Sequence, residues 1–357
     1  METNEAKYLN ALNLALGADF LTLHRLKESF LTYERIWYQA HELGHALNRP
    51  KEKILEAKTR IDPEIEWQKL KDLNINFILK EDINYPDLLK EIPYSPLGIY
   101  VRGELNPKTI KIAIVGTRRP SYYGKQVAEQ ITSELAKAQL EIVSGLSWGT
   151  DTIVHKAALK HKTKTIAVLA TGLDIIYPPI NKKLAQDIMK NGCLISEYPL
   201  STQPLKHHFP LRNRIISGLS SGIIVTEAPF KSGALITAKY ALDQNREVFA
   251  VPGPITSNIS IGTNKLIQQG AKLILSAKDV FQELNLDQDQ EMKEKVLDLE
   301  TKQEQEVMVF FKDANPILID KIIEDTMLEA SEVLATITEL ELKGHLRNIG
   351  GGKYIKV

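Results

Sequence analysis

The sequence predicts an α/β protein built on a doubly wound parallel sheet, with a small helical domain before it and a winged-helix domain after it. Three observations lead to this prediction. Short runs rich in Ile and Val recur between residues 111 and 276, and helical stretches follow most of them. Residues 1 to about 70 show helical periodicity with few turn signals. The last fifty or so residues resemble three helices closed by a glycine-turned hairpin.

Four prolines mark the boundary between the helical N-terminal region and the sheet region. Residues 84–107 contain Pro86, Pro93, Pro96 and Pro107. The same stretch contains one expected strand, at residues 97–103. We therefore expect an N-terminal helical domain at residues 1–75 and a sheet domain at residues 85–284.

The apolar runs predict the strands of the sheet. Nearly continuous apolar strands that alternate with helices are typical of parallel strands covered on both faces. The expected strands lie in seven segments: 111–116, 140–145, 165–172, 193–198, 222–229, 247–253 and 271–276.

The C-terminal part begins with a polar, charged stretch at residues 285–304, which we interpret as a linker. The winged-helix pattern follows at 305–357: one helix before Asn315, helices over 316–327 and 329–344, and a hairpin at 345–357. The third helix is acidic, which favours a protein-contact or regulatory role over reading of a DNA major groove.

Charge and composition limit the possible functions. The 357 residues contain 45 Lys+Arg and 45 Asp+Glu, so any site for a polyanion must be a local cluster. Cys193 is the only cysteine, which excludes a disulfide framework and a multi-cysteine zinc site. No signal peptide is recognisable, and no apolar run approaches the roughly 20 residues of a membrane span. We expect a cytoplasmic protein with no membrane partner.

The loops after the strands are where a ligand is expected, because open parallel sheets bind ligands at the carboxyl ends of their strands. After the first strand comes GTRRPSYYG, residues 116–124. Gly116 permits a tight turn, and Arg118 and Arg119 supply donors suited to phosphate. The alternative is a solvated turn with surface arginines.

Two nucleotide-binding signatures are absent from these loops. The dinucleotide fingerprint G-x-G-x-x-G does not follow the first strand, and no G-x-x-x-x-G-K-[ST] loop occurs anywhere. The second strand ends instead in SGLSWGTD, where Ser144 and Gly145, with Gly149, form an amide-rich turn. His155 lies one helical turn later and is interpreted as a packed helix histidine rather than a catalytic one.

A helix beginning near Phe209 places a charge on its packed side. At about 100° per residue, Arg212 lies between Leu211 and Ile216, whereas Asn213 and Arg214 point away from that face. Because a buried unpaired charge is costly, an anion must meet Arg212.

That anion is either a phosphate from outside or a carboxylate at a strand end, Glu197 or Glu227. We interpret Arg212 as the structural arginine and Arg214 as the phosphate-binding one.

A third basic loop opens the helix after the fifth strand. Lys231, Ser232 and Gly233 form an oxyanion cradle at a helix N-terminus, with a solvated cap as the alternative. Phe230 either stacks on a base or packs into the core as a staple. Convergence of three basic loops in a chain without net charge favours an external polyanion as their ligand over scattered ion pairs within the protein.

Seven segments resemble, in order and spacing, the DNA-processing protein A (DprA/Smf) family of bacteria. The resemblance covers residues 85–275, and the winged-helix pattern matches a common extension of the family. The segments are GTRRPSYYG, SGLSWGTDTIVHKAAL, TGLDIIYP, ISEYP, FPLRNRIISGLS, TEAPFKSGALITAKYAL and VPGPITSNISIGTNKLI.

The resemblance implies an extended Rossmann-like fold that binds single-stranded DNA and forms homodimers. It also implies protection of incoming strands in natural transformation and loading of the RecA recombinase, without catalytic activity or cofactor. The resemblance does not decide whether the N-terminal domain is of the helix-hairpin-helix type or of the sterile-alpha-motif-like type.

The resemblance implies that the DNA pocket of the family corresponds to the three basic loops of this sequence. The Ser144–Gly145 turn lies beside them. The candidate DNA-binding residues are Arg118, Arg119, Ser144, Gly145, Arg212, Asn213, Arg214, Lys231, Ser232 and Gly233. Where relatives often have SGLARGID, this chain has Ser147, Trp148 and Thr150 in place of Ala, Arg and Ile. Trp148 either stacks on a base or covers the helix.

Two enzymatic alternatives have partial signatures. HELGH at residues 41–45 places His41 and His45 as zinc ligands and Glu42 as a base, with Glu64 as a possible third ligand, but the metzincin continuation is missing. A lysine-decarboxylase-like nucleotide hydrolase needs P-G-G-x-G-T-x-x-E, and residues 251–264 lack its paired glycines and acid. We expect a protein that is not an enzyme and needs no metal.

Overall fold

The computed structural model describes residues 2–42, 48–286, 301–311, 316–326 and 328–356. The chain forms two compact units, Met1–Asp287 and Gln288–Val357, and each is described here by itself. None of the helices in the described ranges is long and apolar enough to cross a membrane.

The first unit is organised around one mixed sheet, whose nine strands in the described residues run in the order β1-β2-β6-β5-β4-β3-β7-β8-β9. The seven predicted apolar runs are confirmed as strands β3 to β9, which pair in parallel. The strand expected at 97–103 is β2, which pairs antiparallel with β6 and with β1, a strand that was not predicted. The bounds are β1 Ile75–Leu79, β2 Gly98–Gly103, β3 Lys111–Val115, β4 Glu141–Ser144, β5 Thr165–Val168, β6 Gly192–Ser196, β7 Gly222–Val225, β8 Glu247–Ala250 and β9 Lys272–Leu273.

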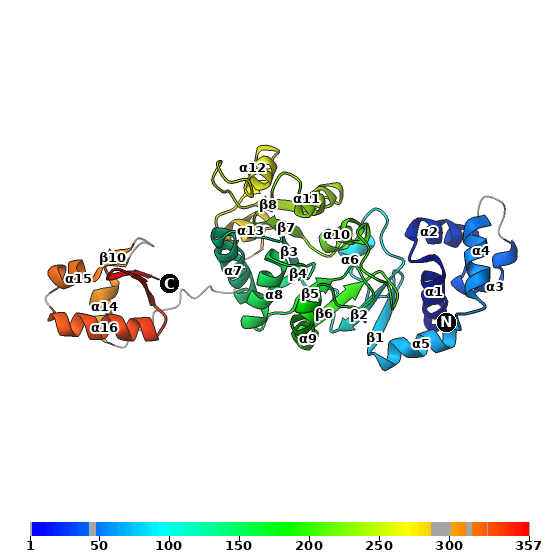
Figure 1. Ribbon diagram of the computed structural model, residues 1–357, viewed down its shortest axis with the longest axis horizontal. Helices are drawn as coiled ribbons and strands as arrows, with labels where there is room; N and C mark the ends of the chain where they lie inside the picture. The colour runs from blue at the N-terminus through cyan, green and yellow to red at the C-terminus, as the bar shows by residue number, and fades with distance from the viewer. Residues whose placement is uncertain (1, 43–47, 287–300, 312–315, 327, 357) are drawn as a thin grey trace. The chain divides into compact units, whose positions relative to one another are not determined.

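The strand order contains a topological switch point between β3 and β7. From β3 the chain winds through β4 and β5 to β6, and it then returns to the other side of β3 and winds outward through β7, β8 and β9 (Figure 1). The connections that leave β3 and β7 therefore separate at the carboxyl edge. This is the position where open α/β sheets bind ligands.

Helices cover both faces of the sheet because side chains alternate along each buried strand. Ile112 and Ile114 of β3 pack with α7 (Tyr122–Lys137), α8 (Thr150–Lys160) and α13 (Ala277–Glu283). Ala113 and Val115 face the opposite side and pack with the other set: α6 (Asp87–Lys90), α10 (His208–Gly218), α11 (Gly233–Asp243) and α12 (Ile261–Gln268). The doubly wound arrangement is thereby confirmed. Next to α8 lies α9 (Lys182–Lys190), preceded by the 3-10 turn η3 (Pro179–Asn181).

The N-terminal helices share a core with the antiparallel edge of the sheet. Phe77 of β1 stacks on Tyr100 of β2 with ring centroids 4.2 Å apart. The Tyr100 hydroxyl donates to Asn10 Oδ1 (2.7 Å) and accepts from Asn13 Nδ2 (3.2 Å), both on α1. The helical elements are α1 Glu2–Leu16, α2 Phe20–Ser29, α3 Tyr33–Tyr38, the 3-10 turn η1 Ala40–Glu42, α4 Asn48–Ala57 and α5 Pro63–Asp72.

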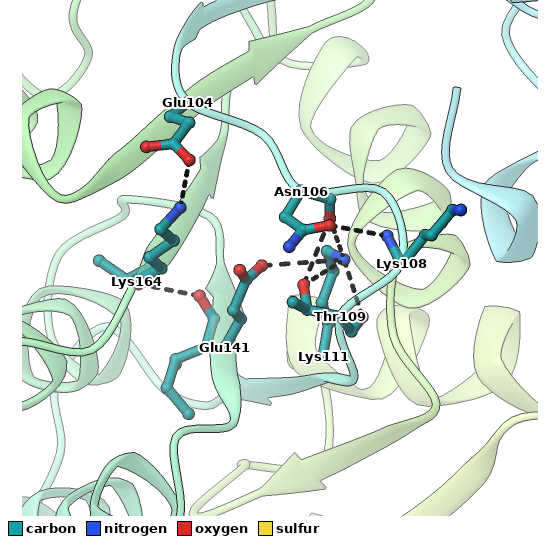
Figure 2. A network of polar contacts seen from close by, with 9 residues as sticks. Glu104, Asn106, Lys108, Thr109, Lys111, Glu141 and Lys164 are labelled. Atoms are coloured by element: carbon teal, nitrogen blue, oxygen red, sulfur yellow. Dashed lines mark hydrogen bonds and ion pairs between the residues drawn. The ribbon is translucent and has the colours of Figure 1, made fainter. Parts of the chain in front are cut away.

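A buried charged network lies where β3 and β4 begin, at the amino edge of the parallel sheet and away from the switch point (Figure 2). The Lys111 Nζ donates to the carbonyl oxygens of Asn106 (2.7 Å) and Thr109 (2.9 Å) and lies 3.7 Å from Glu141 Oε2. Burial lowers the pKa of Lys111, whereas the Glu141 carboxylate opposes that shift. The network supports the loop before β3 and plays no part in the candidate site.

The second unit has the expected three helices and hairpin: α14 (Lys302–Met308), α15 (Ile319–Asp325), α16 (Ala330–Leu342), β11 (Leu346–Gly350) and β12 (Lys353–Lys356). Strand β10 (Ile317–Leu318) adds a third strand that was not predicted. A capping box between Thr301 and Glu304 starts α14 within the expected linker range, of which residues 287–300 lie outside the described residues.

Candidate functional site

A cavity of about 730 Å³ opens at the switch point between β3 and β7, and we call it the switch-point cavity. The loop after β3, the first turns of α10 and the start of α11 all contribute to its wall. It brings together six of the ten predicted site residues: Arg118, Arg212, Asn213, Lys231, Ser232 and Gly233.

Glu227, at the end of β7, holds the loop that carries Arg118. Its carboxylate accepts hydrogen bonds from the Ser121 backbone N–H (2.9 Å) and hydroxyl (2.6 Å), and its carbonyl accepts from the Thr117 N–H (2.8 Å). A side chain at Gly124 would overlap the Glu227 carboxylate, so α7 needs a glycine there. Glu227 therefore holds this loop and does not neutralise Arg212, which corrects that alternative for the partner of Arg212.

The loop after β4 packs against the loop after β3. Gly149 has φ +80, and a Cβ there would lie 2.5 Å from the Thr117 carbonyl oxygen, so the position favours glycine. The Thr150 N–H donates to that carbonyl at 3.2 Å. The loops after β3 and β4 thus hold each other in place at the mouth of the cavity.

Arg212 lies on the packed side of α10, as predicted, but backbone carbonyls hold it rather than a carboxylate. Its guanidinium donates to the carbonyl oxygens of Gly145 (2.8 Å) and Val168, at the carboxyl ends of β4 and β5. Within the described residues no ion pair links it to an acid. Burial lowers the pKa of Arg212 to about 10, partly opposed by nearby Asp151. The side chain is therefore still cationic at neutral pH and places positive charge beside the cavity.

The structure corrects the prediction that Arg214 is the phosphate-binding arginine. Its guanidinium is buried and lies 2.6 and 2.5 Å from the two carboxylate oxygens of Glu197. Phe20 of α2 lies against it, with the ring centroid 4.9 Å from Cζ. The helical periodicity assumed one packed face, but α10 is covered on a second side by the N-terminal helices. Glu197 therefore pairs with Arg214 instead of Arg212, and Arg214 does not line the cavity.

The start of α11 forms the opposite wall. Ser232 is its N-cap, and its hydroxyl accepts from the Ala234 N–H at 3.3 Å. Asn213 Nδ2 donates to the Gly233 carbonyl at 3.3 Å, which links α10 to α11. Lys231 is exposed. Phe230 is also exposed and does not pack into the core as a staple.

The remaining predicted residues have different positions. Arg119 is exposed and lines a smaller cavity next to the first. Ser144 is buried and donates to the Ile114 carbonyl at 2.8 Å, within the sheet. A Cβ on Gly145 would lie 2.6 Å from the Arg212 guanidinium, so Gly145 makes room for that side chain. Ser144 and Gly145 therefore support the site without lining it.

Sequence reasoning missed several lining residues, and among them are Lys206, Tyr177 and Phe209. Phe209 was recognised only as a helix start, although the Arg118 guanidinium lies 5.7 Å from its ring centroid. Tyr177 packs edge-on against Phe209 with ring centroids 5.7 Å apart. An aromatic residue before two prolines in IIYPP was the available signal for Tyr177.

The HELGH motif is only partly described. His41 belongs to η1 (Ala40–Glu42), whereas His45 falls within residues 43–47, outside the described residues. Glu64, the possible third ligand, forms an ion pair with Lys7. In the ranges that the structure describes, no group of three His, Cys, Asp or Glu side chains is placed to hold a metal ion.

These features define a class of protein. A doubly wound sheet carries two arginines, two lysines and a helix N-terminus around one cavity at its switch point, without the glycine fingerprint for dinucleotides. The chain is a Rossmann-like protein with a cavity lined by cationic side chains at the carboxyl edge of its sheet. The sequence model of the family described as DNA recombination-mediator protein A matches residues 76–285, and that of the DprA winged helix domain matches residues 296–352. The chain belongs to the DNA recombination-mediator protein A (DprA/Smf) family.

Individual relatives agree with this assignment. DNA processing protein DprA of Bacillus subtilis is 49% identical over 216 residues, covering 60% of this chain and 73% of the relative. Protein Smf of Synechocystis is 38% identical over 309 residues, covering 82% and 77%. The X-ray structure of DNA processing protein A from Streptococcus pneumoniae has a TM-score of 0.65 at 36% identity, covering 78% of this chain and 97% of that one.

A Helicobacter pylori DNA processing protein A structure has a TM-score of 0.54 at 34% identity, covering 60% of this chain and 96% of that one. That structure is described as giving insight into a unique single-stranded DNA binding mode of the Helicobacter pylori protein. The names of the DprA relatives refer to DNA processing and do not favour the nucleotide-hydrolase alternative.

Proposed function

We propose that this chain binds single-stranded DNA in the switch-point cavity through the phosphates, without reading the base sequence and without covalent chemistry. One observation carries the proposal: Arg118, Arg212 and Lys231, from three distant segments of the chain, line the same cavity. Contacts to the backbone position a strand whatever its sequence.

The chemistry of the wall supports an anionic ligand. The N-terminus of the eleven-residue helix α11 carries a partial positive charge beside the cavity. Arg212 is held by two carbonyl oxygens, so its charge is not cancelled by an ion pair among the described residues. Although Asp151 also lines the cavity, four cationic side chains line it as well, which favours an anionic ligand.

Arg118→Ala and Lys231→Ala should each weaken binding to all oligonucleotides by a similar factor. Each lost phosphate contact should reduce the slope of log K against log salt by about 0.7. Fluorescence anisotropy at several salt concentrations measures both quantities. Lys108→Ala, which removes an exposed lysine at the amino edge of the sheet (Figure 2), is the matched control. Unchanged affinity in both site variants would refute the proposal.

We further propose the mediator role implied by the family: the chain protects incoming strands during natural transformation and loads RecA onto them. Membership of the DNA recombination-mediator protein A family supports this role. RecA assembly on strands coated with this protein, compared with naked strands, tests it. Assembly that is slower on the coated strands would contradict loading.

We also propose a homodimer formed through the β9 edge of the sheet. Apolar side chains are exposed on β9 and on the segments beside it: Ile255, Ile261, Leu273 and Leu275. A sheet edge with exposed apolar residues is a pairing surface. A dimer would present two cavities to one strand, which raises the affinity for long strands by effective concentration.

Leu275→Asp should therefore give a monomer that binds long oligonucleotides at least tenfold more weakly but binds short ones normally, since a single cavity stays intact. Light scattering and anisotropy with two strand lengths measure this. Lys278→Asp, a charge change on nearby α13, is the control. A monomer that still binds long strands tightly would contradict the joint use of two cavities.

A further inference from the structure

We propose that the smaller cavity beside the switch-point cavity is a nucleobase subsite in which Trp148 stacks on one unpaired base. This proposal rests on single-stranded DNA binding and adds a contact to the bases. The cavity, which we call the aromatic cavity, has a volume of about 230 Å³. Arginine side chains and three aromatic rings line it: Arg118, Arg119, Trp148, Tyr177 and Phe209.

Trp148 presents its ring to solvent instead of to the core. Its side chain is 56% exposed and Tyr177 is 45% exposed, whereas Trp37 is buried. Trp148 is therefore not one of the buried core residues among those that the structure describes. Every base offers a π-face, so exposed aromatic rings bind unpaired bases without sequence preference.

The loop that carries Trp148 is held rigidly. The Ser147 N–H donates to Asp151 Oδ2 at 3.0 Å, and the Thr152 hydroxyl donates to the Ser147 carbonyl at 2.8 Å. Gly149 presses the other side of the loop against Thr117 and Arg118. The backbone that carries the indole is thus in place before a ligand arrives, which lowers the entropic cost of binding.

Asn181 connects the two aromatic walls of the cavity. Its buried Nδ2 donates to the Leu146 carbonyl (2.9 Å), in the Trp148 loop, and to the Thr152 hydroxyl (3.0 Å). Asn181 ends the segment that begins with Tyr177, and Tyr177 is itself packed on Phe209. The spacing between the Trp148 and Tyr177 walls is therefore set by the fold.

The two cavities share Arg118, Ser147, Tyr177 and Phe209 in their walls. A phosphate held by Arg118 therefore places the base of the same or the adjacent nucleotide at the aromatic cavity. Trp148 supplies a stacking surface in this cavity next to Arg118 and Arg119. The subsite is a property of this chain's own residue.

The test compares binding to oligothymidylate with binding to an abasic strand of equal length, which has the same phosphates and no bases. Trp148→Ala should bind oligothymidylate about 5- to 150-fold more weakly, the equivalent of one lost base stack. Its binding to the abasic strand and its salt slope should equal those of the unmodified protein. Trp148→Phe should keep most of the affinity.

Two controls make the comparison specific. Tyr38→Ala removes a ring that is 54% exposed on α3, outside both cavities, and should change neither affinity. Tryptophan fluorescence should be quenched by oligothymidylate in the unmodified protein and not in Trp148→Phe, because Trp37 and Trp67 lie outside both cavities.

The outcomes separate this inference from the proposed function. Equal affinities of Trp148→Ala and the unmodified protein for oligothymidylate would overturn the subsite and leave phosphate binding intact. A loss of equal size on both strands, with a reduced salt slope, would overturn stacking and assign the effect to the phosphate loop. Failure of the unmodified protein to bind either strand would overturn both proposals.

Discussion

Glu197→Ala should lower the free energy of unfolding by about 3–5 kcal/mol, which is a large part of the stability of a typical domain. The substitution leaves the Arg214 guanidinium buried without its carboxylate, and Arg214 Nε and Nη1 already have no hydrogen-bond partner in the described residues. Denaturant unfolding followed by circular dichroism measures the loss. Replacing both residues together, Glu197→Leu with Arg214→Met, should recover much of it, because apolar residues of similar volume tolerate burial.

The exposed ion pair Glu56–Arg60 is the matched control, with side chains 70% and 69% exposed. Glu56→Ala should cost at most about 1 kcal/mol, since exposed pairs contribute little. The double variant also distinguishes the two arginines of α10, because Arg214 lies outside the switch-point cavity. It should bind single strands with an unchanged salt slope. A cost below about 1 kcal/mol for Glu197→Ala, or a reduced slope in the double variant, would contradict this assignment.

Acidification from pH 7 to pH 5 should remove about 2 kcal/mol of stability through one residue, His155. Its Nδ1 lies 2.8 Å from the Thr165 hydroxyl, which donates to the Ile142 carbonyl, so Nδ1 carries the proton of the neutral ring. Nε2 is buried without a partner among the described residues. Burial, followed by the positive charge of Arg212, lowers the pKa of His155 from 6.5 to about 3.

The sign follows from proton uptake. Between pH 6.5 and pH 3 the unfolded chain binds a proton at this histidine and the folded chain does not, so the contribution is complete above pH 6.5 and declines as the pH falls. Urea titrations at pH 5, 6 and 7 measure it. His155→Gln should remove this component, whereas His207→Gln, at an exposed position, should retain it. Identical pH profiles for His155→Gln and the unmodified protein would contradict the buried neutral ring.

Local patterns in the chain were sufficient for the α/β class, the seven parallel strands and the three helices of the winged-helix unit. These elements follow from apolar periodicity and from glycine and proline turns, which are properties of neighbouring residues. Strands β1 and β10 were missed because their identity depends on a distant partner: Ile75–Leu79 becomes a strand by pairing with β2, and Ile317–Leu318 by pairing with β12.

The candidate site divides in the same way. GTRRPSYYG and the Lys231–Gly233 cap were recognisable because their donor groups are adjacent in the chain, and both line the switch-point cavity. The role of Arg214 was assigned wrongly and the carbonyl partners of Arg212 were not foreseen, because a helical wheel cannot show that α10 is covered on two sides. Whether a charge meets a carbonyl, a carboxylate or a ligand depends on groups that come together only when β4, β5, β6 and α2 have packed around it.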